Sequence, residues 1–90
     1  MISVIKRDGE VAHFDLAKIS SAIKKAFQAT NTQYTDDIIN LITLRVTSDF
    51  QSRIVEEKVT VEDVQDSVER VLNQTGYVEV AKAYILYRKN

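Results

Sequence analysis

Apolar residues recur at helical spacing in four stretches of the chain, which predict α-helices at 16–29, 36–55, 61–74 and 77–89. No proline or glycine interrupts any of these stretches. Within each one, apolar residues three, four or seven positions apart share one face, and we expect that face to point into a common core. The predicted core residues are Ile19, Ile23, Ala26, Phe27, Ile39, Ile42, Val46, Phe50, Val64, Val68, Val71, Leu72, Val80, Ala81, Tyr84 and Ile85.

Capping residues support these boundaries. Asp15, Thr35 and Thr60 each precede a predicted helix, where a side-chain oxygen can accept a hydrogen bond from a free backbone N–H. Gly76 follows the third helix, at the position where a left-handed glycine commonly ends one.

The first fourteen residues have a strand pattern instead. Residues 2–6 are rich in β-formers, Asp8-Gly9 is a strong signal for a two-residue turn, and residues 11–14 predict the returning strand. Residues 59–60 could add a short third strand. A bare hairpin is marginal in water, so it must pack on the helices. The sequence therefore predicts one α+β domain over residues 1–90, mostly α: a four-helix bundle capped by a small hairpin or three-stranded sheet.

Composition excludes several classes of function. The chain has no cysteine, which rules out disulfides, thiol catalysis and cysteine-ligated zinc. A net charge of -1 does not favour a generally basic nucleic-acid binder. No apolar run approaches the roughly 20 residues of a membrane span, and the first residues lack the pattern of a signal peptide. We therefore expect a cytoplasmic protein.

Catalysis by this chain has little support in the sequence. The only histidine, His13, lacks carboxylate and serine partners at a diagnostic spacing. Asp36-Asp37 and Glu56-Glu57 are adjacent pairs whose side chains point in different directions, and they fit a capped first turn and a solvated loop. No catalytic residue and no metal ligand is predicted.

Anion binding is better supported. Lys6 and Arg7 lie at the end of the hairpin, and Lys18 lies in the first turn of a helix, where a cation opposes the helix dipole. Together with the free N–H groups of that turn they could form a phosphate pocket. The alternative is that all three are ordinary solvated cations.

Two further segments have a structural and a functional interpretation. Arg88 and Lys89 are either a basic helix end that suits the dipole or additional phosphate contacts. Val64 and Gln65 are either a core residue beside a surface residue or an apolar wall beside a hydrogen-bonding group for a base or ribose.

The ordered set of motifs resembles the ATP-cone family over essentially the whole chain. The matching segments are Val4-Ile5-Lys6-Arg7-Asp8-Gly9, Phe14-Asp15-x-x-Lys18-Ile19, Ala22-Ile23-x-x-Ala26, Val61-Glu62-Asp63-Val64-Gln65-Asp66-x-Val68-Glu69 and Val80-Ala81-Lys82-Ala83-Tyr84-Ile85-Leu86-Tyr87-Arg88. ATP-cones are N-terminal allosteric modules of ribonucleotide reductases, and they also occur in a repressor of reductase genes. The resemblance implies the same bundle-and-sheet fold and binding of ATP or dATP, with Mg2+ accompanying the triphosphate.

The resemblance also implies roles for individual residues. Lys6, Arg7 and Lys18 would contact the phosphates. Val4, Ile19 and Val64 would border the adenine. Asp15, Thr60 and Gln65 would lie near the base or sugar, and Arg88 and Lys89 would close the site.

The ending Tyr84-Ile85-x-Tyr87-Arg88 and the stretch Val64-Gln65-Asp66-x-Val68-Glu69 are most similar to cones of anaerobic ribonucleoside-triphosphate reductases. The resemblance therefore implies an N-terminal fragment that is not itself an enzyme, whose partner is the catalytic domain of such a reductase and which could form homo-oligomers. Three alternatives remain: the cone of a transcriptional regulator, a DNA-binding regulator fragment, and a degenerate cone that acts only as an interaction module. The absence of a cysteine zinc ribbon argues against the repressor, and Lys6, Arg7 and Lys18 argue against the degenerate cone.

Overall fold

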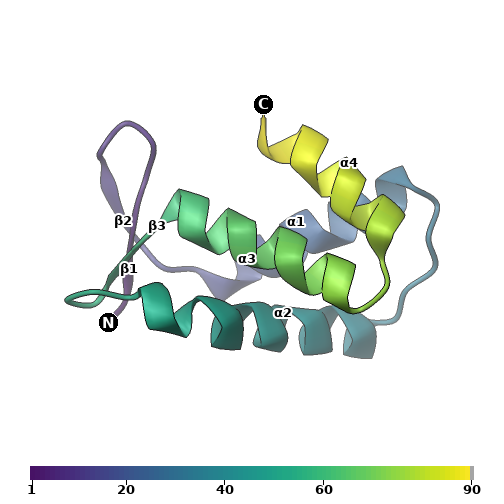
Figure 1. The fold of residues 1–90 in the computed structure, drawn as a ribbon, viewed down its shortest axis with the longest axis horizontal. Helices are drawn as coiled ribbons and strands as arrows, with labels where there is room; N and C mark the ends of the chain where they lie inside the picture. Colours follow the sequence, from purple (N-terminus) through teal and green to yellow (C-terminus); the bar gives the residue numbers. More distant parts are fainter. Residues whose placement is uncertain (90) are drawn as a thin grey trace.

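The computed structural model describes residues 1–89, which form a helical bundle with a small sheet at one end (Figure 1). The helices are α1 (Leu16–Ala29), α2 (Asp36–Phe50), α3 (Val61–Gln74) and α4 (Val78–Arg88). The strands are β1 (Ser3–Ile5), β2 (Val11–His13) and β3 (Lys58–Thr60), and a short 3-10 helix, η1 (Gln51–Arg53), follows α2. The predicted α+β fold, a four-helix bundle capped by a three-stranded sheet, is confirmed. Among residues 1–89 no helix is both long and apolar enough to cross a membrane.

The sheet has the strand order β2-β1-β3, so the first strand of the chain is the central one. β1 pairs with β2 in antiparallel register, with Ser3 opposite His13. It pairs with β3 in parallel, with Ile5 opposite Thr60. Because β3 runs directly into α3, this parallel pairing brings the tip of the hairpin to the N-terminal end of α3 (Figure 1).

The hairpin loop is one residue longer than the sequence indicated. Lys6 N donates to Glu10 O at 2.8 Å, and Gly9 N donates to Lys6 O at 2.9 Å. The loop is therefore Arg7-Asp8-Gly9, in which only Gly9 is left-handed, with φ of 88°. This is the three-residue hairpin in which a type I turn is followed by a glycine bulge. The prediction of a two-residue turn at Asp8-Gly9 was therefore wrong. Arg7 occupies the first position of the loop.

The predicted helix caps are confirmed. The side chains of Asp15, Thr35 and Thr60 accept hydrogen bonds from backbone N–H groups in the first turns of α1, α2 and α3. Gly76 has φ of 89° and donates to Asn73 O at 3.1 Å, while Tyr77 N donates to Leu72 O at 2.9 Å. These two bonds form a Schellman motif at the end of α3.

α2 ends at Phe50, five residues before the predicted boundary at residue 55. The chain must reverse direction here to deliver β3 to the sheet, and a continued helix would prevent that. Val55 and Lys58 exchange two backbone hydrogen bonds of 2.9 Å around Glu56 and Glu57. Both glutamates are left-handed, with φ of 51° and 63°, which identifies a type I′ turn.

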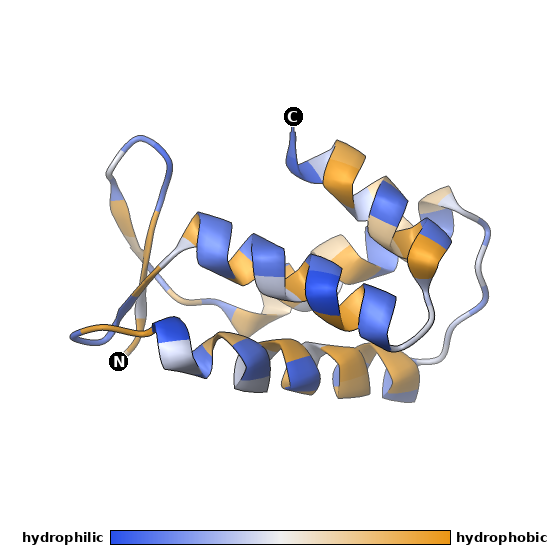
Figure 2. Cartoon of the chain, viewed as in Figure 1, coloured by the Kyte–Doolittle hydropathy of each residue, from blue (hydrophilic) through white to orange (hydrophobic). Residues whose placement is uncertain are grey.

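The predicted inward faces meet in one core between the helices. Hydrophilic and hydrophobic residues alternate along each helix (Figure 2), and a few large apolar side chains, among them Leu41, Leu44 and Leu86, are exposed. Of the predicted core residues, only Ile85 is half-buried rather than buried. The sequence missed three further buried residues, Val59, Thr43 and Ser67. Thr43 Oγ1 donates to Ile39 O at 2.7 Å and lies 3.0 Å from Ser20 Oγ on α1, which satisfies its hydroxyl inside the core.

Candidate functional site

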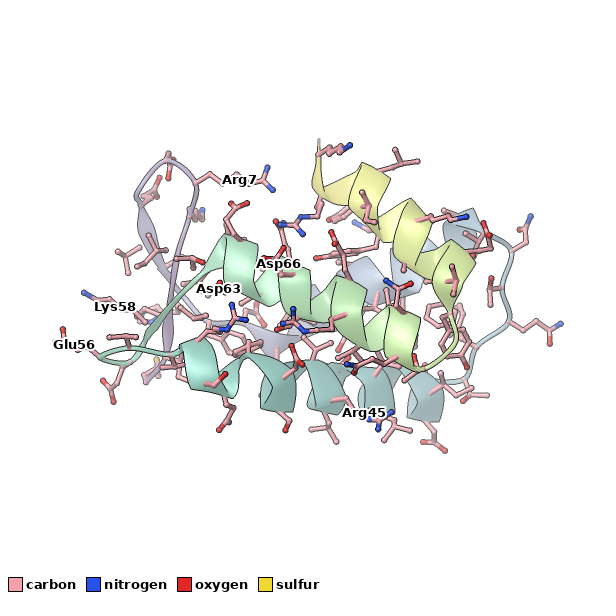
Figure 3. The ribbon with its side chains drawn as sticks, in the orientation of Figure 1. Arg7, Arg45, Glu56, Lys58, Asp63 and Asp66 are labelled. Carbon is pink, nitrogen blue, oxygen red and sulfur yellow. The ribbon has the colours of Figure 1, made fainter. Side chains whose placement is uncertain are left out.

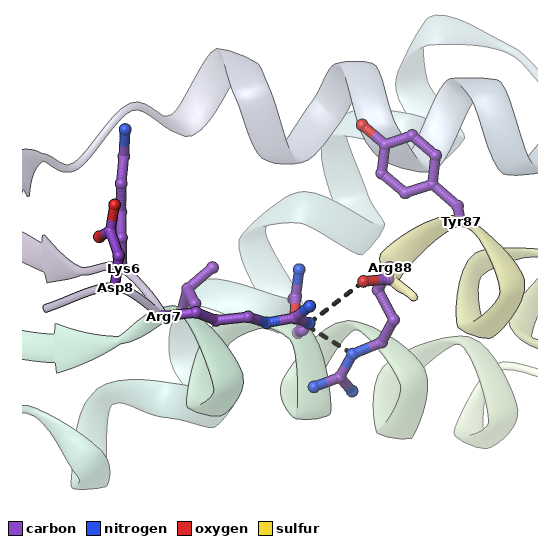
Figure 4. Close-up of a pocket in the computed structure, with 7 residues that line it drawn as sticks. Lys6, Arg7, Asp8, Tyr87 and Arg88 are labelled. Carbon is purple, nitrogen blue, oxygen red and sulfur yellow. Dashed lines mark hydrogen bonds between the residues drawn. The ribbon is translucent and has the colours of Figure 1, made fainter. Parts of the chain in front are cut away.

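A cleft of about 770 Å³ opens where the hairpin loop, the start of α3 and the end of α4 meet (Figure 4). Its size falls within the range of roughly 300–1,000 Å³ that is usual for small-molecule sites. The hairpin contributes the cations Lys6 and Arg7 and the carboxylate Asp8. α3 contributes an apolar and an amide side chain, and α4 contributes an aromatic ring and a guanidinium. The lining residues are Lys6, Arg7, Asp8, Val61, Gln65, Tyr87 and Arg88.

A smaller cavity of about 170 Å³ lies beside the sheet. A cavity of about 150 Å³ is enough to hold benzene, so this one has room for a flat ring but not for a whole nucleotide. Mostly apolar side chains surround it, and the charged ones are Lys6 just after β1, Asp15 just before α1, and Lys18 on α1. The lining residues are Val4, Lys6, Ala12, His13, Phe14, Asp15, Lys18, Ile19, Val61 and Val64.

Lys6 and Val61 line both cavities, so the two spaces adjoin. The Lys6 and Lys18 side chains are exposed, and within residues 1–89 neither has a carboxylate within 4.0 Å of its amine. Lys18 also remains in the first turn of α1, where its charge opposes the dipole. Lys6, where the two cavities meet, and Lys18, in the smaller one, therefore have no ion-pair partner among residues 1–89, although Asp8 and Asp15 line the same cavities.

The Arg7 side chain extends from the hairpin loop (Figure 3), and its guanidinium is hydrogen-bonded to other parts of the protein. Arg7 Nε donates to Glu62 Oε1 at 2.8 Å, and Arg7 Nη2 donates to Gln65 Oε1 at 2.8 Å and to the backbone oxygen of Arg88 at 3.1 Å. The last acceptor lies at the C-terminal end of α4, which the helix dipole makes favourable for a cation. These bonds connect the hairpin loop to both α3 and α4.

Arg88 lies deeper and is held more firmly. Its Nη1 donates to Asp66 Oδ1 at 2.8 Å and to Glu69 Oε1 at 2.6 Å, and its Nε donates to Gln65 Oε1 at 3.1 Å. Only 13% of its side chain is exposed. Burial works to lower the pKa of Arg88, but the hydrogen bonds with Asp66 and Glu69 outweigh it and raise the pKa above the ordinary arginine value. Arg88 therefore remains charged, as a fixed cation at the end of α4.

The structure gathers most of the predicted site residues around the two cavities. Val4, Lys6, Asp15, Lys18, Ile19 and Val64 line the smaller one, and Lys6, Arg7, Gln65 and Arg88 line the larger one. Thr60 and Lys89 line neither. The Thr60 hydroxyl caps α3 by accepting from Asp63 N at 3.1 Å, and Lys89 follows the last turn of α4.

Sequence reasoning missed other parts of the site. It assigned no role to Tyr87 and Val61, which line the larger cleft, or to the row of carboxylates on α3 that holds the two arginines. The row consists of Glu62, Asp66 and Glu69, spaced at i, i+4 and i+7, and that spacing on one helix face was the available signal.

Comparison with known proteins gives a consistent result. Residues 2–90 match the ATP cone domain family. The ribonucleoside-diphosphate reductase subunit alpha of Chlamydia pneumoniae is 44% identical over 95 residues, which is 99% of this chain and 9% of the relative. The anaerobic ribonucleoside-triphosphate reductase of Haemophilus influenzae is 39% identical, over 94% of this chain and 12% of the relative. The vitamin B12-dependent ribonucleoside-diphosphate reductase of Mycobacterium tuberculosis is 34% identical, over 96% of this chain and 12% of the relative. The chain thus spans about a tenth of the length of these relatives.

Proposed function

The chain belongs to the ATP cone domain family, and on that premise we propose that it is a regulatory domain that binds ATP or dATP and adjusts the activity of a ribonucleotide reductase. Binding can do so only if the nucleotide has different affinities for two states of the parent enzyme. The isolated domain performs no chemistry in this account.

The observation that carries the proposal is the position of Lys6 between a mostly apolar cavity and a cleft that also contains Arg7 and Arg88. The adenine would enter the smaller cavity, between Val4, Ile19 and Val64. The triphosphate would then pass Lys6 and Lys18 toward Arg7. A nucleotide has the matching division into a flat ring at one end and a chain of negative charges at the other.

The remaining predicted contacts belong to the same proposal. Asp15, Thr60 and Gln65 would lie near the base or the sugar, and Arg88 and Lys89 would lie at the α4 side of the phosphates. Within residues 1–89 no group of three or more metal-ligating side chains is arranged to hold a metal. A Mg2+ ion would therefore be held mainly by the phosphates, as is usual for this cation.

The parent protein is part of the proposal too. Reductases of three kinds are similar to this chain, and these similarities do not select one of them. We propose the anaerobic ribonucleoside-triphosphate class from the motifs in α3 and α4 alone. We place the domain at the N-terminus of such a reductase in the cytoplasm, with the catalytic domain as its partner and self-association as one means of regulation.

Calorimetric titration of the domain with Mg-ATP, Mg-dATP and Mg-GTP tests this function. Saturable binding of the two adenine nucleotides, with GTP much weaker, is the expected result. A folded domain that binds none of the three at millimolar concentration would refute nucleotide binding by this chain.

A further inference from the structure

The Arg7 guanidinium has two possible classes of partner, acceptors of the protein and acceptors of an anion, and the structure shows the first of them. Its partners are the Glu62 carboxylate, the Gln65 amide oxygen and the Arg88 backbone oxygen, at 2.8, 2.8 and 3.1 Å. All three are acceptors, and a phosphate group would offer acceptors of the same kind. A phosphate that reaches Arg7 Nε must take the place of Glu62.

From this geometry we infer that Glu62 is an internal competitor for the phosphates of the ligand. Glu62 occupies Arg7 in the free domain, gives it up when an anion binds, and thereby sets the affinity of the site. This inference rests on the proposed nucleotide site and adds to it a residue that weakens binding. None of the predicted contact residues has that role.

The exposure of both side chains allows Arg7 and Glu62 to separate and take other partners. The side chains of Arg7 and Glu62 are both 50% exposed, so water can replace either partner as they separate. Ion pairs at such positions contribute little net stability. Arg88, in contrast, is 13% exposed and binds Asp66 and Glu69. Glu62 Oε2 also lies 3.6 Å from Arg88 Nη2, so Glu62 keeps a second arginine as a partner when it gives up Arg7.

The backbone allows the same movement. Arg7 occupies a loop of three residues whose ends are tied by the Lys6–Glu10 bond, so its side chain can swing without disturbing the sheet. Release from Gln65 would also loosen the hold of the loop on α3, and release from the Arg88 oxygen would disconnect it from α4. Anion binding would therefore change how the hairpin is held against the end of α4.

The electrostatic balance explains why the competition affects affinity. Glu62, Asp66 and Glu69 carry three negative charges against the two positive charges of Arg7 and Arg88. The negative charge around the two arginines therefore already exceeds their positive charge before a triphosphate arrives. Replacing Glu62 by glutamine removes one charge and leaves a neutral amide of the same size.

The test is a titration of three proteins with Mg-ATP: the unchanged domain, Glu62→Gln and the matched control Glu79→Gln. Glu79 is an exposed carboxylate on α4 that pairs with Lys82 and does not touch Arg7. We expect Glu62→Gln to bind Mg-ATP about two- to fivefold more tightly, in line with the modest energy of an exposed pair, and Glu79→Gln to match the unchanged domain. Equal or weaker binding by a folded Glu62→Gln variant would overturn the inference.

A second readout separates this inference from the nucleotide proposal. The Nε–H resonance of Arg7, followed by NMR, should shift on addition of Mg-ATP or of inorganic tripolyphosphate, and should also shift in the Glu62→Gln variant. If tripolyphosphate moves this resonance and ATP does not bind, the exchange stands and the nucleotide function fails. If ATP binds without moving it, the nucleotide function stands and the exchange is overturned.

Discussion

Arg7 Nε and Glu62 Oε1 lie 2.8 Å apart although 55 residues separate them in the sequence. The contact exists because β1 pairs in parallel with β3, which places the hairpin loop beside the first turn of α3. It connects the loop that is proposed to bind phosphate to α3, and Arg7 Nη2 connects the same loop to the end of α4. The following predictions concern this network and the packing beneath it.

Arg88 should contribute more to stability than Arg7. Arg88→Met removes the shared partner of Asp66 and Glu69 and leaves carboxylates unpaired, which costs several kcal/mol when the site is fully buried. Because Asp66 is half-exposed, we expect a loss of about 2 kcal/mol in the free energy of unfolding. Arg7→Ala should cost less than about 1 kcal/mol, because its ion pair is solvated. Urea denaturation measures both, and equal losses would contradict this ranking.

The Asp49–Arg70 pair should make stability depend on acid pH. Arg70 Nη2 donates to Asp49 Oδ2 at 2.6 Å, and this hydrogen bonding lowers the pKa of Asp49 against the opposing effect of burial. Because the pKa of Asp49 is lower in the folded protein than the value of about 3.9 in the unfolded chain, the carboxylate stabilises the fold above about pH 3.9. This stability is lost as the pH falls from there through the pKa of the folded state. Arg70→Met should therefore reduce the fall in melting temperature between pH 5 and pH 2. An unchanged pH profile in that variant would contradict the assignment.

Tyr84 should make stability depend on alkaline pH. Its ring is 4% exposed, and burial raises the pKa of its phenol to about 12 against the opposing charge of Arg88. Because the pKa of Tyr84 is higher in the folded protein than the value of about 10 in the unfolded chain, the neutral phenol stabilises the fold below about pH 10. This stability, roughly 2 kcal/mol, is lost as the pH rises toward about 12. Phenolate absorbance should show one late-titrating tyrosine that is missing in Tyr84→Phe. If the Tyr84→Phe variant still shows a late-titrating tyrosine, the late titration belongs to another tyrosine ring.

The turn at Glu56 and Glu57 should be open to stabilisation. Both residues are left-handed, a conformation that costs roughly 1–2 kcal/mol for a residue with a side chain and almost nothing for glycine. The double replacement Glu56→Asn with Glu57→Gly supplies the residues that a type I′ turn prefers. We expect a gain of about 1 kcal/mol, which is roughly 4–8 °C in Tm for a domain of this size.

The reverse change provides a control for that gain. Gly9 has φ of 88° and open space around the position of a Cβ, so Gly9→Ala should lose stability through backbone conformation alone. If the Glu56 and Glu57 replacements fail to stabilise while Gly9→Ala destabilises, the strain at the Glu56-Glu57 turn is absent.

Local signals in the sequence were sufficient for the helices. The apolar spacing predicted three of the four within about a residue at each end, and the caps at Asp15, Thr35 and Thr60 depend only on neighbouring backbone groups. The early end of α2 at Phe50 was missed because it depends on a distant requirement, the delivery of β3 to β1. The length of the hairpin loop was missed because Asp8-Gly9 suits two turn types, and the pairing of Lys6 with Glu10 selects one.

The candidate site also has a part that local sequence signals predict and a part that only the assembled fold determines. Lys6 and Lys18 could be singled out because a motif and a helix dipole point to them. The partners of Arg7 could not, because they come from α3 and α4 and meet it only through the parallel pairing of β1 with β3. A sequence shows that a cation is present, but its counterion depends on the assembled fold.

The most direct test of the central claim is the affinity for Mg-ATP of the double variant Lys6→Ala with Lys18→Ala. The matched control is Lys25→Ala with Lys82→Ala, two exposed lysines that line neither cavity at the sheet end. We predict that the first variant keeps the circular dichroism of the unchanged domain and loses binding by at least about 30-fold, since hydrogen bonds to charged groups contribute about 1.5–3 kcal/mol each. The control should bind as the unchanged domain does. Full affinity in a folded Lys6→Ala, Lys18→Ala variant would contradict the claim that the nucleotide binds where the two cavities meet.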